Sequence, residues 1–400
     1  MAYKARSSRC PASKLSVMER VHTASHDTPN RPVLSLFSGA GGLDLGFERA
    51  GFQPLLALDS QSVAVETYNY NRRERGAVAH VVDLATEKPA AIIDRWEQSA
   101  GSDTPPVGFV GGPPCQAFSE SNVHRIENDP RSLLPLAYAE LLRAFNERYE
   151  HRLRFFAFEN VAGLGYRPHA DSLCEILQRF RDAGFEQVEP IMLDALDFGV
   201  PQRRRRMFIV GFHPADSQVK FISPIGDSSV RVTVREAIGR LKNPVPFARK
   251  LNPADVGLHP NHWHMNPRSD KFRSGTNEPG HHLGRSFRRL HWDEPSLTVA
   301  FGHREVAVHP DGTRRLSILE AMLLQGFPSS YVLRGTLSDQ IRLVSDAVPP
   351  PLAEALALAV AASLDSNDAL RAQAHISTNG QEPQLGLAGL QTIAPKSTRP

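Results

Sequence analysis

One of the three cysteines, Cys115, directly follows the sequence Gly-Gly-Pro-Pro at residues 111–114, which gives its thiol a fixed position. Proline restricts φ and has no amide donor, so the two prolines stiffen the approach to the cysteine. The two glycines allow the backbone to come close to a ligand or to another strand. A cysteine held in this way is typical of a nucleophile. The alternative is a small buried hydrophobic residue beside a proline turn.

Two further groups of residues could act beside such a thiol. Glu159 follows Arg154 and the apolar run 155–158, which predict a buried strand. An acid at the carboxyl end of a strand in a parallel sheet faces the ligand crevice, although a salt bridge or a helix-initiating acid is the alternative. Four consecutive arginines, residues 203–206, precede a second apolar strand at 207–212. Planar guanidinium groups suit phosphates and the edge of a base.

A strand–loop–helix unit near the start of the chain predicts where a cofactor binds. The apolar run 32–37 leads into a glycine-rich loop at 38–42, and the next predicted strand ends at Asp59. This pattern is typical of nucleotide binding, with the acid accepting hydrogen bonds from ribose hydroxyls. Asp44 stands where a dinucleotide-binding loop has its third glycine, which favours an adenosyl ligand without a pyrophosphate. Asp83, at the end of the next strand, could reach an adenine amino group.

Composition and charge indicate a globular protein that binds a polyanion. The chain has 41% apolar and 22% charged residues and a net charge of +3. Residues 200–315, however, hold 20 Lys and Arg against 10 Asp and Glu. A basic segment on a nearly neutral protein points to a polyanion bound on one face, with a solvated charged surface as the alternative. Residues 120–131 have no apolar periodicity, so we expect a loop that could close over the thiol.

Other classes of protein fit the sequence less well. We find no run of about 18 apolar residues and no signal peptide, so no membrane span is expected. The cysteines have no paired spacing, which suits a reducing cytoplasm. Cys174 lies in an amphipathic helix pattern and is expected in the protein core. Eight of the sixteen histidines fall between His259 and His309, but no pair has convincing ligand spacing, so no metal site is predicted.

Taken together, these motifs resemble the DNA (cytosine-5) methyltransferase family of the bacterial restriction–modification type, over roughly residues 32–364. The motifs occur in the order of that family. The resemblance implies an α/β fold, a Rossmann-like, doubly wound and mostly parallel sheet of the S-adenosylmethionine-dependent methyltransferase type. The matching segments are 37–42 (FSGAGG), 111–116 (GGPPCQ), 158–161 (FENV), 202–206 (QRRRR) and 315–328 (RLSILEAMLLQGFP).

The resemblance and the polar composition of the two ends together divide the chain into five parts. Residues 1–30 are expected to be a disordered lead-in, and residues 31–240 a catalytic and cofactor-binding domain. A small irregular target-recognition domain follows at 241–313. Residues 314–364 are C-terminal helices, the last of which returns to the catalytic domain, and 365–400 are a disordered tail.

For catalysis, the resemblance implies that the Cys115 thiolate adds to C6 of a cytosine while Glu159 hydrogen-bonds N3. Arg206 would bind the cytosine O2, and Arg204 a nearby phosphate or the thiol loop. C5 then takes a methyl group from S-adenosyl-L-methionine, and loss of the C5 proton, with water as a plausible base, releases the thiol. Because the reactive carbon is stacked inside the duplex, the base must be flipped out.

The resemblance also implies two sets of binding residues. Phe37 would pack on the adenine, with Gly39 and Gly41 near the methionine end of the cofactor. The complete cofactor set is Phe37, Gly39, Gly41, Asp59, Asp83, Leu134, Asp346 and Val348. The DNA-binding set is Ser119, His124, Arg125, Gln202 and Arg203.

At one pair of residues the chain departs from the family. The family usually has Gly-Asn just before the final Ala-Val-Pro-Pro, whereas this chain has Ser345 and Asp346. Ionised aspartate offers only acceptors, whereas asparagine offers both donors and an acceptor. Asp346 would therefore either favour the sulfonium or amino group of the cofactor or weaken binding of its carboxylate.

The expected partner is double-stranded DNA, with a cognate restriction endonuclease as a functional companion and no membrane. We expect a monomer in the bacterial cytoplasm, associated with the nucleoid. Three alternatives remain open: an RNA (tRNA) cytosine-C5 methyltransferase, a non-catalytic DNA-binding relative, and a nicotinamide-dependent dehydrogenase. The missing third glycine disfavours the dehydrogenase.

Overall fold

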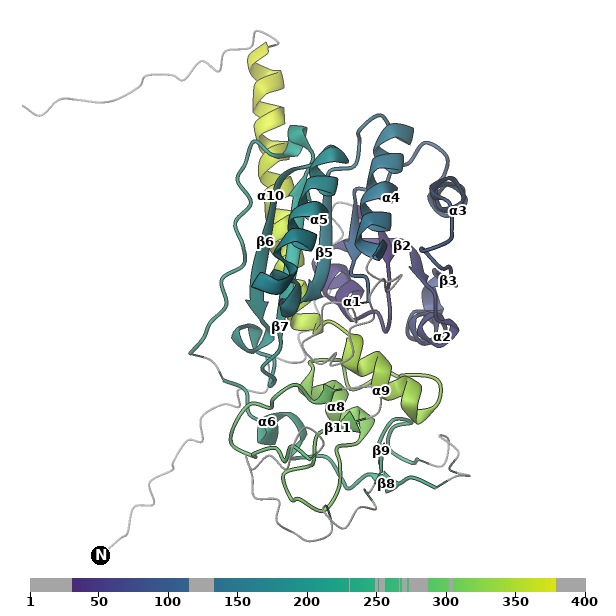
Figure 1. The fold of residues 1–400 in the computed structure, drawn as a ribbon, viewed down its shortest axis with the longest axis vertical. Helices are drawn as coiled ribbons and strands as arrows, with labels where there is room; N and C mark the ends of the chain where they lie inside the picture. The colour runs from purple at the N-terminus through teal and green to yellow at the C-terminus, as the bar shows by residue number, and fades with distance from the viewer. Residues whose placement is uncertain are drawn as a thin grey trace, which may run out of the picture.

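The computed structural model describes residues 31–114, 133–229, 231–248, 251, 256–265, 267, 272, 287–301 and 305–378. A sheet covered by helices forms the main body, and a smaller lobe lies at one end of it (Figure 1). The predicted lead-in at 1–30 and the loop at 120–131 lie outside the described residues, as do Cys115, Ser119, His124 and Arg125.

The central sheet has seven strands in the order β3-β2-β1-β4-β5-β7-β6. The pairs β3–β2, β2–β1, β1–β4 and β4–β5 are parallel, and β7 runs antiparallel to both of its neighbours. The strand order reverses between β1 and β4, which is where ligands bind in open sheets of this kind. The predicted doubly wound, mostly parallel sheet is confirmed. The strands are β1 Arg31–Leu36, β2 Phe52–Asp59, β3 Ala79–Val81, β4 Gly108–Gly111, β5 Phe155–Val161, β6 Glu186–Asp194 and β7 Arg205–Phe212.

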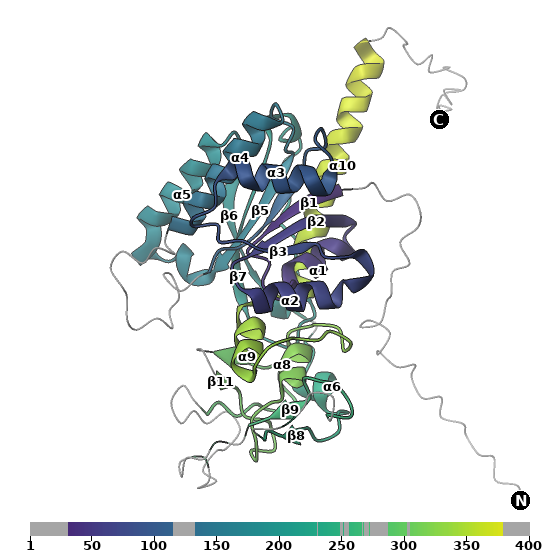
Figure 2. The same cartoon turned by 90° about the vertical axis from the view of Figure 1, so that its right-hand side faces the viewer.

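Helices cover both faces of the sheet because successive strand residues point to opposite sides (Figure 2). Leu34 and Leu36 pack with the α3–α4–α5 side, whereas Val33 packs with the α1–α10 side. The first group is α3 Pro89–Ala100, α4 Leu134–Arg148 and α5 Ala170–Asp182, and the second is α1 Gly42–Arg49, α2 Ser62–Asn71 and α10 Pro350–Thr378. Short 3₁₀ turns complete the body: η2 Arg73–Arg75, η4 Ala162–Gly165, η5 Arg167–His169, η6 Ala195–Phe198 and η7 Pro214–Asp216.

The smaller lobe packs around an apolar core that also includes Ala40 and Ala64 of the main body. Each of its described helices begins with a capping box, formed by Thr233, Ser317 or Thr336. Val234 and Ile238 belong to this core, so the lobe begins before residue 241, the boundary expected from the sequence. Its helices are α6 Val234–Ile238, α8 Ile318–Leu324 and α9 Leu337–Asp346. Its strands are β8 Val245–Pro246, β9 Trp263–His264, β10 Ala300–Phe301 and β11 Glu305–Val306.

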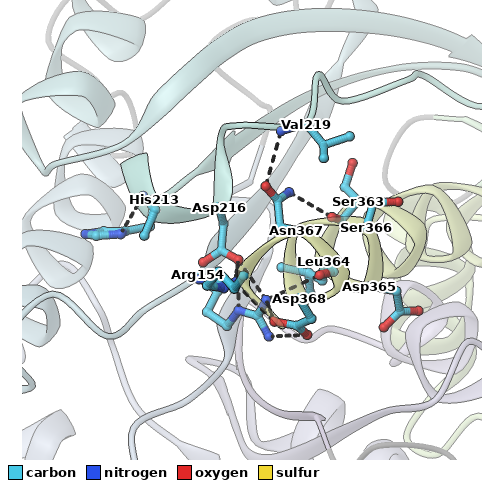
Figure 3. Close-up of polar contacts among 12 residues, drawn as sticks. Arg154, His213, Asp216, Val219, Ser363, Leu364, Asp365, Ser366, Asn367 and Asp368 are labelled. Atoms are coloured by element: carbon cyan, nitrogen blue, oxygen red, sulfur yellow. Dashed lines mark hydrogen bonds and ion pairs between the residues drawn. The ribbon is translucent and has the colours of Figure 1, made fainter. Parts of the chain in front are cut away.

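Helix α10 continues to Thr378, beyond Leu364, where the sequence predicted its end. The polar residues that suggested a disordered tail instead bind the body (Figure 3). Asp368 pairs with Arg154 at 2.7 Å, and the buried Asp216 contacts the same guanidinium at 2.7 Å and also pairs with Arg371. In residues 365–378, polarity therefore reflects ion pairing rather than disorder, and the rest of the predicted tail, 379–400, lies outside the described residues.

Two other sequence expectations concern the helices. Cys174 is exposed on α5, so its predicted core position is wrong: Ile176 and Phe180 define the buried face, and Cys174 lies about 200° from Ile176 around the helix. Within the described part of the chain, the helical stretch Leu337–Gln373 passes a length and composition test for a membrane span, with mean hydropathy 1.5. Because 67% of its apolar window is buried in the protein, we interpret it as a core stretch.

Candidate active site

The strand registers place four predicted site positions in one row at the carboxyl edge of the sheet. Leu36 of β1 is aligned with Leu58 of β2 and with Gly111 of β4. Gly111 is in turn aligned with Phe158 of β5. The next residue of each strand therefore stands at the same level, at the point where the strand order reverses. These residues are Asp59, Phe37, Gly112 and Glu159.

The loop after β1 adopts a strained conformation around Asp59. Phe37, Gly39 and Gly41 all have positive φ, at 53°, 53° and 75°. A non-glycine residue in this region costs about 1–3 kcal/mol and is typical of functional sites. The amide of Gly39 donates to Asp59 Oδ2 at 2.9 Å, and the amide of Gln61 donates to Oδ1 at 2.8 Å. Burial raises the pKa of the Asp59 carboxyl, against these two hydrogen bonds.

Three more of the predicted cofactor residues, Val348, Asp83 and Leu134, lie on other elements. A Cβ added at Gly42 would lie 2.3 Å from the carbonyl oxygen of Val348, so the start of α1 packs directly on residue 348. Asp83 is exposed; the amide of the preceding Val82 donates to the Asp59 carbonyl at 2.9 Å. Leu134 is buried at the first position of α4.

Glu159 and Arg206 form an ion pair at the edge of the sheet, with 2.9 Å between Arg206 Nε and Glu159 Oε1. Strands β5 and β7 bring the two together, because Arg206 lies opposite Val161, two residues after Glu159. Burial raises the pKa of the Glu159 carboxyl, Arg206 and Arg204 lower it, and the charge of Asp346 raises it further. The net shift is upward, which favours a protonated acid that can donate a hydrogen bond.

Residues 111–114, here called the thiol approach because they lead to Cys115, lie directly against Glu159. A Cβ added at Gly112 would lie 2.5 Å from the Glu159 carbonyl oxygen and 2.6 Å from its Oε2. The side-chain amide of Asn160 donates to the carbonyl of Pro113 at 3.4 Å. Asn160 was not identified from the sequence as a site residue, although it lies inside the FENV motif. Gly112 and Asn160 thus fix the segment that leads to Cys115 against the acid.

The arginine segment alternates between buried and exposed side chains, as extended backbone requires. Gln202 is fully buried; its Nε2 donates to the Leu324 carbonyl at 3.4 Å, and its Oε1 accepts from the Val299 amide at 3.3 Å. Arg203 is exposed, and its amide donates to Ser296 at 2.8 Å. Gln202 was predicted to contact DNA, but its amide is used inside the protein, whereas Arg203 points outward.

Arg204 is 2% exposed and holds the chain on both sides of Asp346. Its guanidinium donates to the carbonyl of Ser345 and, at 3.0 Å, to that of Ala347. These two hydrogen bonds position Asp346, and the contact of Arg204 with a phosphate or the thiol loop stays a prediction. Asp346 itself is exposed at the end of α9 and acts electrostatically on Glu159.

Among the described residues, no three His, Cys, Asp or Glu side chains are grouped closely enough to hold a metal ion.

Comparisons with known proteins find relatives over most of the chain. The model of the family described as C-5 cytosine-specific DNA methylase matches residues 32–362. Type II methyltransferase M.MthTI of Methanothermobacter thermautotrophicus is 34% identical over 358 residues, covering 84% of this chain and 98% of that protein. Type II methyltransferase M.FnuDI of Fusobacterium nucleatum is 32% identical over 365 residues, covering 85% and 96%.

Solved structures share the fold at lower identity. A prophage-encoded protein of E. coli superposes with a TM-score of 0.66 at 22% identity, covering 84% of this chain and 99% of that one. The S. pombe Dnmt2 methyltransferase gives a TM-score of 0.55 at 17% identity, covering 85% and 100%.

Proposed function

Because the chain belongs to the C-5 cytosine-specific DNA methylase family, we propose that it methylates C5 of a flipped-out cytosine in double-stranded DNA through a covalent bond between Cys115 and C6. The proposed methyl donor is S-adenosyl-L-methionine. The observation that carries the proposal is the ion pair of Glu159 and Arg206 beside Gly112, three residues before the cysteine. This arrangement brings an acid, a guanidinium and the segment that leads to a thiol together at the carboxyl edge of the sheet.

The protein groups account for the steps on the base. The Cys115 thiolate forms a bond to C6, and the electron pair of the C5–C6 double bond moves toward C5. Glu159, with its raised pKa, donates its proton toward N3 and so withdraws charge from the ring. Arg206 orients Glu159 and, from the same position, can donate to O2 of the base. After methylation, loss of the C5 proton to water and of the thiolate from C6 restores the double bond.

The loop after β1 has the chemistry to hold an adenosyl cofactor. A Cβ added at Gly39 would find only the Phe37 carbonyl, at 3.9 Å, so the loop leaves open space there. The Asp59 oxygens each accept one backbone amide and keep lone pairs for ribose hydroxyls. The exposed carboxylate of Asp83 can accept from the adenine amino group. When bound, S-adenosyl-L-methionine supplies an electrophilic methyl group.

We propose that the smaller lobe is the target-recognition domain. The basic balance of residues 200–315 suits phosphates, and Arg203 and Arg205 point outward beside the crevice. Because related proteins are named type II methyltransferases, we also propose that the enzyme works beside a cognate restriction endonuclease. It would act as a monomer in the bacterial cytoplasm.

The test is to incubate the enzyme with methyl-labelled S-adenosyl-L-methionine and either duplex DNA or tRNA, and then to digest the products to nucleosides. Label in 5-methyldeoxycytidine supports the proposal, whereas label in 5-methylcytidine from tRNA would assign the enzyme to RNA. No label with either substrate would favour a non-catalytic DNA-binding relative. Bisulfite sequencing of DNA from cells that express the protein then identifies the methylated sequence.

A further inference from the structure

Residues 331–334, here called the 331–334 segment, connect the smaller lobe to the body of the protein. Asn71 of α2 binds both backbone groups of Val332: its Nδ2 donates to the carbonyl at 2.8 Å, and its Oδ1 accepts from the amide at 2.9 Å. Asn261 of the smaller lobe binds both backbone groups of Leu333, each at 2.8 Å. Val332 is therefore held by an asparagine of the main body, and its neighbour Leu333 by an asparagine of the smaller lobe.

Tyr331, the first residue of this segment, reaches the proposed cofactor loop. Its buried hydroxyl donates to the carbonyl of Ala40 and accepts from Arg72 Nη1 at 3.4 Å. Arg72 Nη2 in turn donates to the carbonyl of Gly41 at 3.4 Å. Burial raises the pKa of Tyr331 to about 12, so its hydroxyl keeps its proton and remains a donor at neutral pH.

The 331–334 segment packs tightly against the loop. A Cβ added at Gly41 would lie 2.8 Å from Arg72 Nη1, 3.0 Å from Tyr68 Cδ2 and 3.1 Å from the Tyr331 hydroxyl. Arg72 is itself fixed, because it pairs with Glu48 at 2.8 Å and lies 3.8 Å from the centre of the Tyr68 ring. A displacement of Tyr331 must therefore displace the loop.

On its other side the 331–334 segment is fixed to the smaller lobe through Asn261. Asn261 is fully buried, and its backbone carbonyl accepts from the amide of Leu319 at the start of α8 at 3.0 Å. Its backbone amide donates to His259 Nδ1 at 3.1 Å. The smaller lobe and the cofactor loop are thus joined by a short chain of buried, directional hydrogen bonds.

We infer that Tyr331 is a positioning residue for the cofactor loop and that the 331–334 segment couples cofactor affinity to DNA binding by the smaller lobe. This inference rests on the proposed function, because it takes the loop as the cofactor site and the lobe as the DNA site. DNA that orders the lobe fixes Asn261 and, through Leu333 and Tyr331, holds Ala40 and Gly41 in their bound position. By linkage, the cofactor tightens DNA binding by the same factor.

The test measures binding of S-adenosyl-L-homocysteine by calorimetry, with and without a duplex that the enzyme methylates. We expect the duplex to tighten binding to the wild type about fivefold or more. Tyr331→Phe should weaken binding about 5- to 10-fold and reduce the enhancement by DNA. Tyr138→Phe is the matched control, because it removes a buried tyrosine hydroxyl that donates to the carbonyl of Ala157 on β5 rather than to the loop.

A second pair of variants tests the lobe side. Asn261→Asp replaces the amide that donates to Leu333 with an acceptor and should reduce the enhancement by DNA. Asn146→Asp is its control, because the buried Asn146 amide donates to the Ala183 carbonyl within the body.

The outcomes separate the inference from the proposed function. No binding to the wild type would contradict the proposed cofactor site. Wild-type binding that Tyr331→Phe leaves unchanged, or that Tyr138→Phe weakens equally, would overturn the positioning role. Wild-type affinity that is independent of DNA, or an enhancement that Asn261→Asp and Asn146→Asp leave equal, would overturn the coupling.

Discussion

Gly112→Ala adds one methyl group at the point where the thiol approach meets Glu159. The new Cβ would lie 2.5 Å from the Glu159 carbonyl oxygen and 2.6 Å from Oε2, whereas ordinary contacts begin at 3.4 Å. Relief of the clash with Oε2 alone needs a shift of about 0.8 Å, and a misplacement of about 1 Å at a catalytic group can cost about 10²-fold. We therefore expect kcat to fall about 100-fold.

The assay is single-turnover transfer of labelled methyl groups to a duplex, together with thermal unfolding. Overpacking of this kind costs about 1–3 kcal/mol of stability, so the variant should remain folded at 25 °C. Gly257→Ala is the matched control, because no atom lies within 4 Å of its added Cβ and its φ is not in the left-handed region. A folded Gly112→Ala enzyme with kcat within threefold of the wild type would refute the proposed contact between the thiol approach and the acid.

Three further predictions follow from the charged groups. Asp346→Asn removes a charge that raises the pKa of Glu159, so Glu159 loses its proton at a lower pH. The alkaline limb of the kcat/KM profile should therefore move to lower pH, and a limb that stays in place contradicts this. Asp94→Asn, at an exposed position on α3, is the control. Arg204→Met leaves the carbonyls of Ser345 and Ala347 without their charged donor. Denaturant titration should then show a free energy of unfolding lower by about 3–5 kcal/mol. A loss below about 1 kcal/mol would be inconsistent with the two hydrogen bonds. Asp216→Asn weakens the attachment of α10 and should lower the free energy of unfolding by about 1–3 kcal/mol. This is less than for a fully buried ion pair, because Arg154 and Arg371 are partly exposed. Hydrogen exchange in residues 365–378 that matches the wild type would argue against this attachment.

Much of the site could be predicted because it lies at strand ends. Apolar runs identify buried parallel strands, and the residue after each run falls at the carboxyl edge. Asp59 and Glu159 were placed in this way, and strand register then brings them into one row with Gly112. The pairing of Glu159 with Arg206 also follows once β7 is placed next to β5.

The rest depended on contacts between distant segments. A run of four arginines does not reveal which members are buried, because that depends on the phase of β7 relative to residues 345–347 and 296. Polar residues after Leu364 looked like a tail because their partners, Arg154 and Asp216, lie far away in the sequence. Asn71 and Asn261 look like ordinary polar residues until both are seen to bind the same segment.

The most direct test of the account is covalent trapping on a duplex that carries 5-fluorocytosine at the methylated position, in the presence of S-adenosyl-L-methionine. Fluorine at C5 blocks the elimination that would release the thiol, so the wild type should remain attached to the DNA under denaturing conditions. Cys115→Ala should leave no attached protein. A wild-type enzyme that methylates the ordinary duplex but is never trapped, or a Cys115→Ala variant that is trapped equally, would contradict the proposed mechanism.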